Sequence, residues 1–277
     1  MKSSMLSLKS ALCWIVGSVF LCSLVFYRVI CPRFLDKLEK QTEILTFLVQ
    51  TGPQKEALPS DCLAELLDLS VDAPLAFSHV DEQKLQTKLL QCPVIQEATC
   101  KKIKPDILYI DYAVRKPAAL VVDFDNVALD QEGVLFPMLP FFSPKKLPEL
   151  YFGENAFQEI PSLGDALTGP YAELAFSLLS LLEGKGKDLF VIQKIDVSKA
   201  FAPSLGKREI VVLLENAVYP LGSMKPSYLL HFLRLSTKGF AKELAQYLLL
   251  RQTLLDGPYT EKERVIDLRI DHLAFID

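Results

Sequence analysis

The sequence holds few groupings of residues that could do chemistry, and the clearest is the segment Ser143–Lys146. It has the S-x-x-K spacing of penicillin-binding enzymes, whose serine lies at a helix start with the lysine one turn later on the same face. Here Pro144 and Pro148 bracket the segment, and prolines at such positions favour a turn over a catalytic helix. No K-T-G motif follows. We therefore expect a loop at this position.

A second grouping, Asp123, Asp125 and Asp130, could suggest a calcium-binding loop. An EF-hand requires further oxygen ligands and a glutamate at its twelfth position. Counted from Asp123, that position is Val134, whose side chain cannot coordinate a metal. We therefore expect a polar turn between strands.

Histidine and cysteine chemistry is also poorly supported. The three histidines lie far apart, and the six cysteines include no C-x-x-C pair that would indicate zinc. For Cys62, Cys92 and Cys100 a single disulfide is one possibility, but we favour buried free thiols. Hydrolase, metalloprotease, P-loop and dinucleotide-binding motifs are missing, so we expect no enzyme activity and no cofactor. The net charge of -4 predicts no nucleic-acid binding.

A membrane anchor is the strongest signal near the N-terminus. The stretch Ser10–Tyr27 has no charged residue, and its length as a helix nearly crosses a hydrocarbon core of about 30 Å. We predict a transmembrane helix at 10–30, with a tail at 1–9 and a linker at 31–41. A cleaved signal peptide is the alternative, but the apolar core is long and no small-x-small cleavage site follows it.

The next part of the chain predicts an α+β layer of two helices on a small sheet. We expect Ser60 to cap the first helix, and the second helix to begin at Ser78 with Asp81 in a capping box. The expected order is strand, helix, helix, strand and strand, at 43–50, 60–69, 78–91, 97–103 and 108–114. In this domain, at 42–116, the first strand should pair with the hairpin made by the last two.

The remaining residues, 117–277, predict a mixed, β-rich domain. Short strands and turns are expected up to Gly169, because proline and glycine are frequent there. Further elements are expected as a helix at 170–182, strands at 189–197 and 208–215, a helix at 225–255 with a break near Gly239, and one final strand at 264–276.

Four short motifs follow the predicted anchor in order. The first is Pro105, Leu108, Ile110, Tyr112, Val114, Arg115, Pro117 and Ala119. The others are Asp130, Gly133 and Phe136; then Leu147, Pro148, Leu150 and Gly153; then Ile266, Asp267, Leu268 and Arg269. In this order they resemble the FtsQ/DivIB family of bacterial cell-division proteins. Val114 departs from the family pattern, which has glutamate there, and residues 225–262 are longer than the resemblance leads us to expect.

The resemblance implies a POTRA-like domain at 42–116 and a non-enzymatic divisome scaffold in the cell inner membrane, enriched at the division site. The N-terminus would be cytoplasmic and residues 31–277 periplasmic. The implied partners are FtsB-like and FtsL-like small bitopic coiled-coil proteins and, through them, the septal peptidoglycan synthase. An alternative is a POTRA-type periplasmic chaperone or a component of envelope protein export. A membrane-tethered hydrolase is disfavoured, since no nucleophile with a base is visible.

The end of the sequence predicts a partner-binding site. Apolar and charged residues alternate from Ile266 to Asp271, and the phase then flips at Leu273 and Phe275. A bulge or bend near Asp271 and His272 would produce the flip and leave apolar side chains beside a free edge, which invites a strand from another chain. We expect the backbone N–H of Leu273 to face outward there. The hypothetical site is Ile270, His272, Leu273 and Phe275, where the resemblance also points. The alternative is a buried strand that only completes the sheet.

Overall fold

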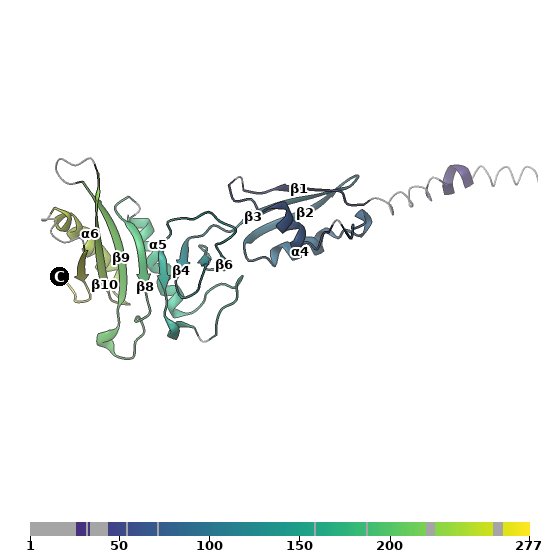
Figure 1. The fold of residues 1–277 in the computed structure, drawn as a ribbon. Coiled ribbons are helices and arrows are strands. Elements are labelled where there is room, and N and C mark those ends of the chain that lie inside the picture. The colour runs from purple at the N-terminus through teal and green to yellow at the C-terminus, as the bar shows by residue number, and fades with distance from the viewer. Residues whose placement is uncertain are drawn as a thin grey trace, which may run out of the picture. The chain divides into compact units, whose positions relative to one another are not determined.

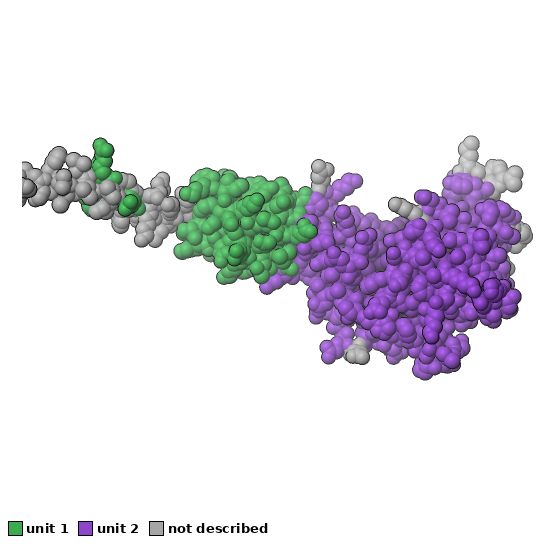
Figure 2. Space-filling view, turned by 180° about the vertical axis from the view of Figure 1, so that it is seen from behind, with its two compact units in different colours: residues 1–52, 58–90, 97–112 green, residues 53–57, 91–96, 113–277 purple. Residues whose placement is uncertain are grey.

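The computed structural model describes residues 26–31, 33, 44–53, 55–70, 72–157, 159–186, 188–219, 225–256 and 263–277. Two compact units make up the chain, coloured separately in Figure 2. Unit 1 comprises residues 1–52, 58–90 and 97–112, and unit 2 comprises residues 53–57, 91–96 and 113–277. The last stretch of unit 1 ends close to the predicted domain boundary at 116–117.

The predicted membrane segment at 10–30 falls outside the described residues except for Phe26–Ile30, a single π-helical turn. The predicted tail, and the predicted linker apart from Cys31 and Arg33, are likewise not described. Across the part of the chain that the structure does describe, no helix has the length and apolar character needed to cross a membrane.

Unit 1 has the expected order of strand, helix, helix, strand and strand (Figure 1). Its elements are β1 (Phe47–Thr51), α3 (Ser60–Leu66), the 3-10 helix η2 (Phe77–His79), α4 (Glu82–Leu90), β2 (Ile95–Ile103) and β3 (Ile107–Val114). The sheet order is β1-β3-β2, with β1 parallel to β3. This pairing confirms that the first strand joins the hairpin of the last two, and the mixed composition confirms the α+β class.

The helix starts in unit 1 differ from those predicted. The N-cap of α3 is Pro59, and Ser60 instead accepts a hydrogen bond from the side chain of Gln50 at 3.0 Å. The second helix, α4, begins after Asp81, whose carboxylate accepts from the backbone N–H groups of Gln83 and Lys84. The prediction of a start at Ser78 was wrong because aspartate is at least as good an N-cap as serine.

Unit 2 is built on a nine-stranded sheet, ordered β12-β11-β10-β9-β8-β7-β4-β5-β6. Its strands are β4 (Ala119–Val121), β5 (Val127–Leu129), β6 (Leu135–Pro137), β7 (Glu149–Tyr151), β8 (Val191–Asp196), β9 (Ile210–Val218), β10 (Ser227–Leu235), β11 (Glu263–Asp267) and β12 (Phe275–Ile276). Its helices are α5 (Pro170–Gly186), α6 (Phe240–Leu255) and the short 3-10 helices η3 (Glu154–Ala156) and η4 (Leu205–Lys207). The pair β10 and β11 is parallel, because α6 crosses between them, whereas β11 and β12 are antiparallel.

Both long helices of unit 2 pack on one face of this sheet, α5 against β8 and α6 against β10. The alternation of burial along the strands shows which face they cover: Val212 and Leu214 of β9 and Leu233 of β10 are fully buried. The side chains between them stay partly exposed on the other face. The helices therefore cover one face of the sheet, and on the opposite face the side chains of β9 and β10 stay partly exposed among the described residues.

The prediction of a helix over 225–255 was wrong in its first part, since residues 227–235 form strand β10 and the helix starts at Phe240. The cause is the apolar residues on both faces of β10. Leu229 and Leu233 point into the core, but Leu230 and Phe232 on the open face are apolar too. A strand with two apolar faces lacks the polar alternation that separates a strand from a buried helix.

The edge of the sheet at β6 is covered by the segment 164–167. The backbone N–H of Leu135 donates to Asp165 at 3.0 Å, and the N–H of Gly164 donates back to Leu135 at 2.8 Å. Further along, Leu167 donates to Gly133 at 2.9 Å. These bonds occupy the outward-facing backbone groups of Leu135 in the strand and the carbonyl of Gly133 in the turn before it.

Candidate partner-binding site

The terminal segment forms two strands joined by a turn, and not the single strand predicted at 264–276. Strand β11 ends at Asp267, and the turn places His272 in the left-handed region at φ +61. Within it the N–H of Leu273 donates to the carbonyl of Ile270 at 3.1 Å. The predicted bend near His272 is therefore confirmed. The expectation that the Leu273 N–H faces outward was wrong, because the turn uses that donor.

All four residues of the hypothetical site lie on this turn and on β12, with exposed or half-exposed side chains. Ile270, Leu273 and Phe275 are 52%, 53% and 55% exposed, and His272 is also exposed. The alternation predicted Ile270 on the core-facing side with Ile266, but only Ile266 is buried, since the chain has left the strand before residue 270. The predicted residues are thus neighbours on one turn and edge strand, together with one that the hypothesis omitted, Ile276, 50% exposed.

The backbone of β12 leaves one residue open to pairing. Val265 and Asp277 exchange two hydrogen bonds, at 3.2 and 3.0 Å, and so form a bonded pair of the antiparallel ladder. The next pair, Ile266 and Ile276, is then of the non-bonded kind, in which the backbone groups point away from each other. The N–H and C=O of Ile276 therefore face outward, and no described residue bonds to them.

An apolar stripe on the open face of the sheet leads up to this edge. Leu213, Phe232 and Val265 lie side by side on β9, β10 and β11, all partly exposed. Phe275 lies opposite Asp267, so it belongs to the same face. Sequence reasoning missed this stripe, although its signal was present as apolar residues on both faces of 210–215 and 227–235.

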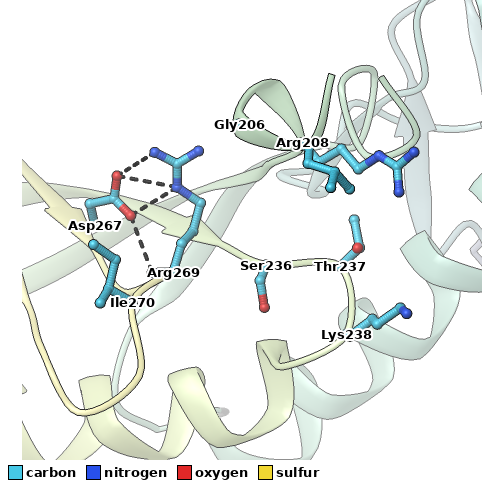
Figure 3. Close-up of a pocket in the computed structure, with 9 residues that line it drawn as sticks. Gly206, Arg208, Ser236, Thr237, Lys238, Asp267, Arg269 and Ile270 are labelled. Atoms are coloured by element: carbon cyan, nitrogen blue, oxygen red, sulfur yellow. Dashed lines mark hydrogen bonds and ion pairs between the residues drawn. The ribbon is translucent and has the colours of Figure 1, made fainter. Parts of the chain in front are cut away.

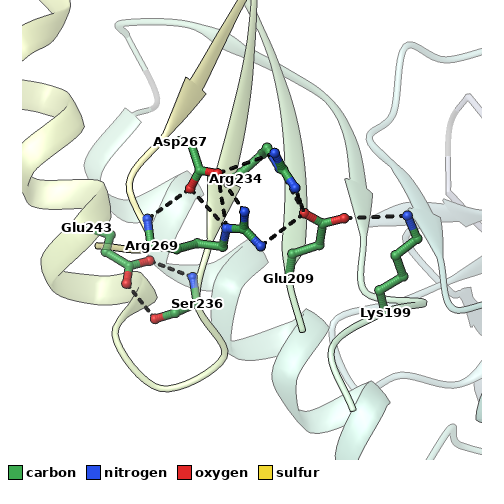
Figure 4. Close-up of polar contacts among 7 residues, drawn as sticks. All are labelled: Lys199, Glu209, Arg234, Ser236, Glu243, Asp267 and Arg269. Atoms are coloured by element: carbon green, nitrogen blue, oxygen red, sulfur yellow. Dashed lines mark hydrogen bonds and ion pairs between the residues drawn. The ribbon is translucent and has the colours of Figure 1, made fainter. Parts of the chain in front are cut away.

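Polar contacts tie the turn to the neighbouring strands (Figure 4). Arg234 of β10 donates twice to Glu209 and pairs with Asp267 at 3.3 Å. Arg269 donates to both oxygens of Asp267, at 2.9 and 2.6 Å, and approaches Glu209 at 3.4 Å. Lys199 adds a contact with Glu209 at 3.5 Å. The charged side chains of Asp267 and Arg269 are therefore both paired with other side chains of the same chain.

The electrostatics of these carboxylates agree with such pairing. Burial alone would raise the pKa of Glu209, but the hydrogen bond and charge of Arg234 outweigh it and hold the pKa below its ordinary value. Burial likewise raises the pKa of Asp267, but the hydrogen bonds from Arg269 lower it by more, so the pKa lies below its ordinary value. The hydrogen bond with Asp267 in turn raises the pKa of Arg269. All three groups stay charged at neutral pH.

A pocket of about 460 Å³ opens beside the turn (Figure 3). It is lined by Leu205, Gly206, Arg208, Ser236, Thr237, Lys238, Asp267, Arg269 and Ile270. The hydroxyl of Ser236 donates to Glu243 and accepts from the N–H of Gly239, so it stabilises the start of α6. Among these lining residues no histidine or cysteine accompanies the serine, and the arrangement does not resemble a nucleophile with its base.

The other predicted features have structural uses. Asp123 accepts from the N–H groups of Phe152 and Gly153, and Asp130 accepts from Arg115. No set of three or more potential metal ligands is found within the described ranges. Residues 143–148 form neither helix nor strand, as predicted. Cys92 and Cys100 are buried thiols as predicted, and burial raises the pKa of Cys100 to about 11. The prediction was wrong for Cys62, which is only half-buried.

Comparison with protein-family models and with curated proteins gives no match for this sequence.

Proposed function

We propose that this chain is a membrane-anchored, non-enzymatic scaffold of the bacterial division machinery that binds a partner by adding a strand to β12. The observation that carries the proposal is the open edge at Ile276, flanked by half-exposed Leu273 and Phe275. An edge with unpaired backbone groups and apolar side chains is a template for an extended segment of another protein. Its position agrees with the terminal strand to which the resemblance points.

The apolar stripe on the open face supports the same role. Leu213, Phe232 and Val265 form a partly exposed row that runs to β11, the strand beside the edge. A partner that pairs with β12 and folds back over this row would bury apolar surface in addition to making backbone hydrogen bonds. The FtsB-like and FtsL-like coiled-coil proteins are the partners we propose, with the septal peptidoglycan synthase as an indirect one.

We regard unit 1 as POTRA-like, because its strand, helix, helix, strand, strand order and the parallel pairing of β1 with β3 are in keeping with such a domain. The anchor at 10–30, cytoplasmic residues 1–9 and periplasmic residues 31–277 complete the proposal. They rest on the uncharged apolar stretch and on the resemblance.

Localisation in living cells tests the scaffold role. A fluorescent protein fused before residue 1 leaves β12 unaltered, and its fluorescence should gather at the septum. Depletion of the chain should block division and leave filaments or enlarged cells. Even distribution around the envelope with normal division would refute the scaffold and favour a chaperone or export role, for which secretion defects on depletion would be the sign.

A single added cysteine tests the topology. Ser204 is exposed in unit 2, so Ser204→Cys supplies a surface thiol, while Cys92 and Cys100 are buried. A membrane-impermeant maleimide applied to spheroplasts should label the variant more strongly than the unmodified chain. Labelling only after the membrane is opened would overturn the periplasmic assignment.

A further inference from the structure

A buried polar cluster joins three elements in the core of unit 2. Asn216 of β9, His231 of β10 and Tyr247 of α6 are all fully buried. The Nδ1 atom of His231 lies 2.8 Å from the hydroxyl of Tyr247, and the two rings meet edge to face at 5.8 Å. Arg251 of α6 donates to the side-chain oxygen of Asn216 at 2.8 Å.

The second nitrogen of the histidine, Nε2, is buried and has no hydrogen-bond partner in the described part of the chain. A buried polar atom without a partner is costly, and the cost rises when the atom must carry a charge. The ring therefore sits at a position where gaining a proton is strongly opposed by desolvation.

The charged groups around the ring oppose protonation as well. Arg264 of β11 lies directly beside His231 in the strand register, and its guanidinium donates to the carbonyl of Leu254 at 3.0 Å. Arg251 approaches from α6. On β9, the neighbours are Leu214 in register and the neutral Asn216. Desolvation by burial is the largest cause that lowers the pKa of His231, and the positive charges of Arg264 and Arg251 add to it. Together they bring this pKa to about 4.

We infer that His231 makes the packing of α6 and β11 on β10 sensitive to acid: when this region opens, the ring gains water and a proton, and the open form becomes more populated. The ring lies under α6 and beside β11, the strand that carries β12. Acid should therefore loosen the elements that hold the terminal edge. This inference concerns unit 2 alone and does not depend on the proposed function.

The direction and the size of the pH effect on this opening follow from the linkage between proton binding and stability. The pKa of His231 is about 4 in the closed form and returns to its ordinary value of 6.5 when exposed. The open form thus binds the proton more tightly, and stability that is complete above pH 6.5 is lost as the pH falls toward 4. Between pH 7 and pH 5 the ratio of open to closed molecules should rise roughly 20-fold.

Hydrogen exchange measures this opening directly. Protection factors, from which the intrinsic effect of pH on exchange has been removed, should fall roughly 20-fold between pH 7 and pH 5 for amides of β10, α6 and β11. The variant His231→Gln keeps a polar group near Tyr247 but cannot titrate, so its protection should be nearly constant over this range. The control His79→Gln, at an exposed site in unit 1, should behave like the unmodified chain.

An equal loss of protection in His231→Gln, or no loss in the unmodified chain, would overturn the inference. A second measurement needs no variant at all. The ring proton resonance of His231 should stay constant from pH 7 to pH 5 in the folded chain. Titration of His231 near pH 6.5 in the folded chain would contradict the inference even if the variant fails to fold.

Discussion

The two edges of the sheet in unit 2 are built in opposite ways. At β6, the segment 164–167 forms backbone hydrogen bonds with the strand and the preceding turn. At β12, the backbone groups of Ile276 face outward, and apolar side chains stand exposed beside them. Natural sheets protect their edges against unwanted pairing, so an edge left open beside a protected one needs an explanation. The proposed partner binding would supply that explanation, and changes at the two edges should then have different consequences.

The largest effect is expected from Ile276→Pro. Proline removes the outward N–H at the open edge, while the bonds between Val265 and Asp277 remain available. A partner carbonyl left without its donor should weaken binding roughly 100-fold, equivalent to about 2.7 kcal/mol. Affinity for a purified FtsB-like periplasmic segment can be measured by calorimetry.

The matched control is Ile276→Ala, which removes the side chain but keeps the backbone donor, and it should lose no more than about 10-fold in affinity. Circular dichroism and the unfolding midpoint should be the same for both variants. Full binding by Ile276→Pro, in a protein that remains folded, would show that the edge is not the docking strand.

At the closed edge the expected effect is on stability. Gly133 has φ +80 in the turn before β6, and a methyl group there would lie 2.7 Å from the ring of Phe176. Gly133→Ala should therefore lower the free energy of unfolding of unit 2 by about 1–3 kcal/mol. Urea unfolding measures it. Gly206→Ala is the control, since that site is open and the change should stay within about 0.5 kcal/mol. Equal stability of the two variants would show that the turn accommodates the added methyl group at Gly133 without cost, contrary to the prediction.

A smaller effect should come from the apolar side chains of the open edge. Leu273→Ala and Phe275→Ala should each weaken partner binding about 10-fold, or about 1.4 kcal/mol, and leave stability unchanged because both side chains are half exposed. Leu249→Ala serves as the control, because this leucine is exposed on α6 and lies outside the edge. If all three variants bind equally well, the side chains of the edge do not contribute to recognition.

The smallest effect is expected at the ion pair between Lys242 and Asp271. Its atoms lie 2.6 Å apart, and the hydrogen bond from Lys242 lowers the pKa of Asp271, but both side chains are exposed. Pairs of this kind contribute little because water and salt screen them. Lys242→Ala should change partner affinity less than roughly twofold and leave the melting temperature unchanged. A large loss of binding would show that Lys242 contacts the partner directly.

The sequence predicted the structure correctly where the hydrophobic periodicity was clear or where proline and glycine marked the ends of an element. The alternation from Leu108 to Val114 gave β3, the proline and glycines around α5 gave its approximate limits, and the phase flip after Asp271 gave the turn at His272. Each of these signals is local, since it depends on a few neighbouring residues and their preferred backbone geometry.

The failures have non-local causes. The prediction of a helix over residues 227–235 failed because both faces of strand β10 are apolar, and the two faces are distinguished only once β9 and β11 lie beside it. The donor of Leu273 was misplaced because the turn was expected to be a mere bend in one strand. The network of Glu209, Arg234 and Arg269 joins residues up to 60 positions apart in sequence, so no local sequence pattern predicts it.

That network also bears on how tightly a strand could bind. Arg234 and Asp267 lie opposite each other on β10 and β11, and Glu209 comes just before the start of β9. Arg269 joins the first residues of the turn to Asp267 and Glu209. The edge is thus fixed by contacts within the chain, and in the proposed role it would not have to rearrange when a partner binds. The loss of conformational entropy on association would then fall on the incoming segment almost alone. A partner segment that is held in an extended conformation, because a neighbouring coiled coil or linker restrains it, should bind more tightly than the same residues in a free peptide.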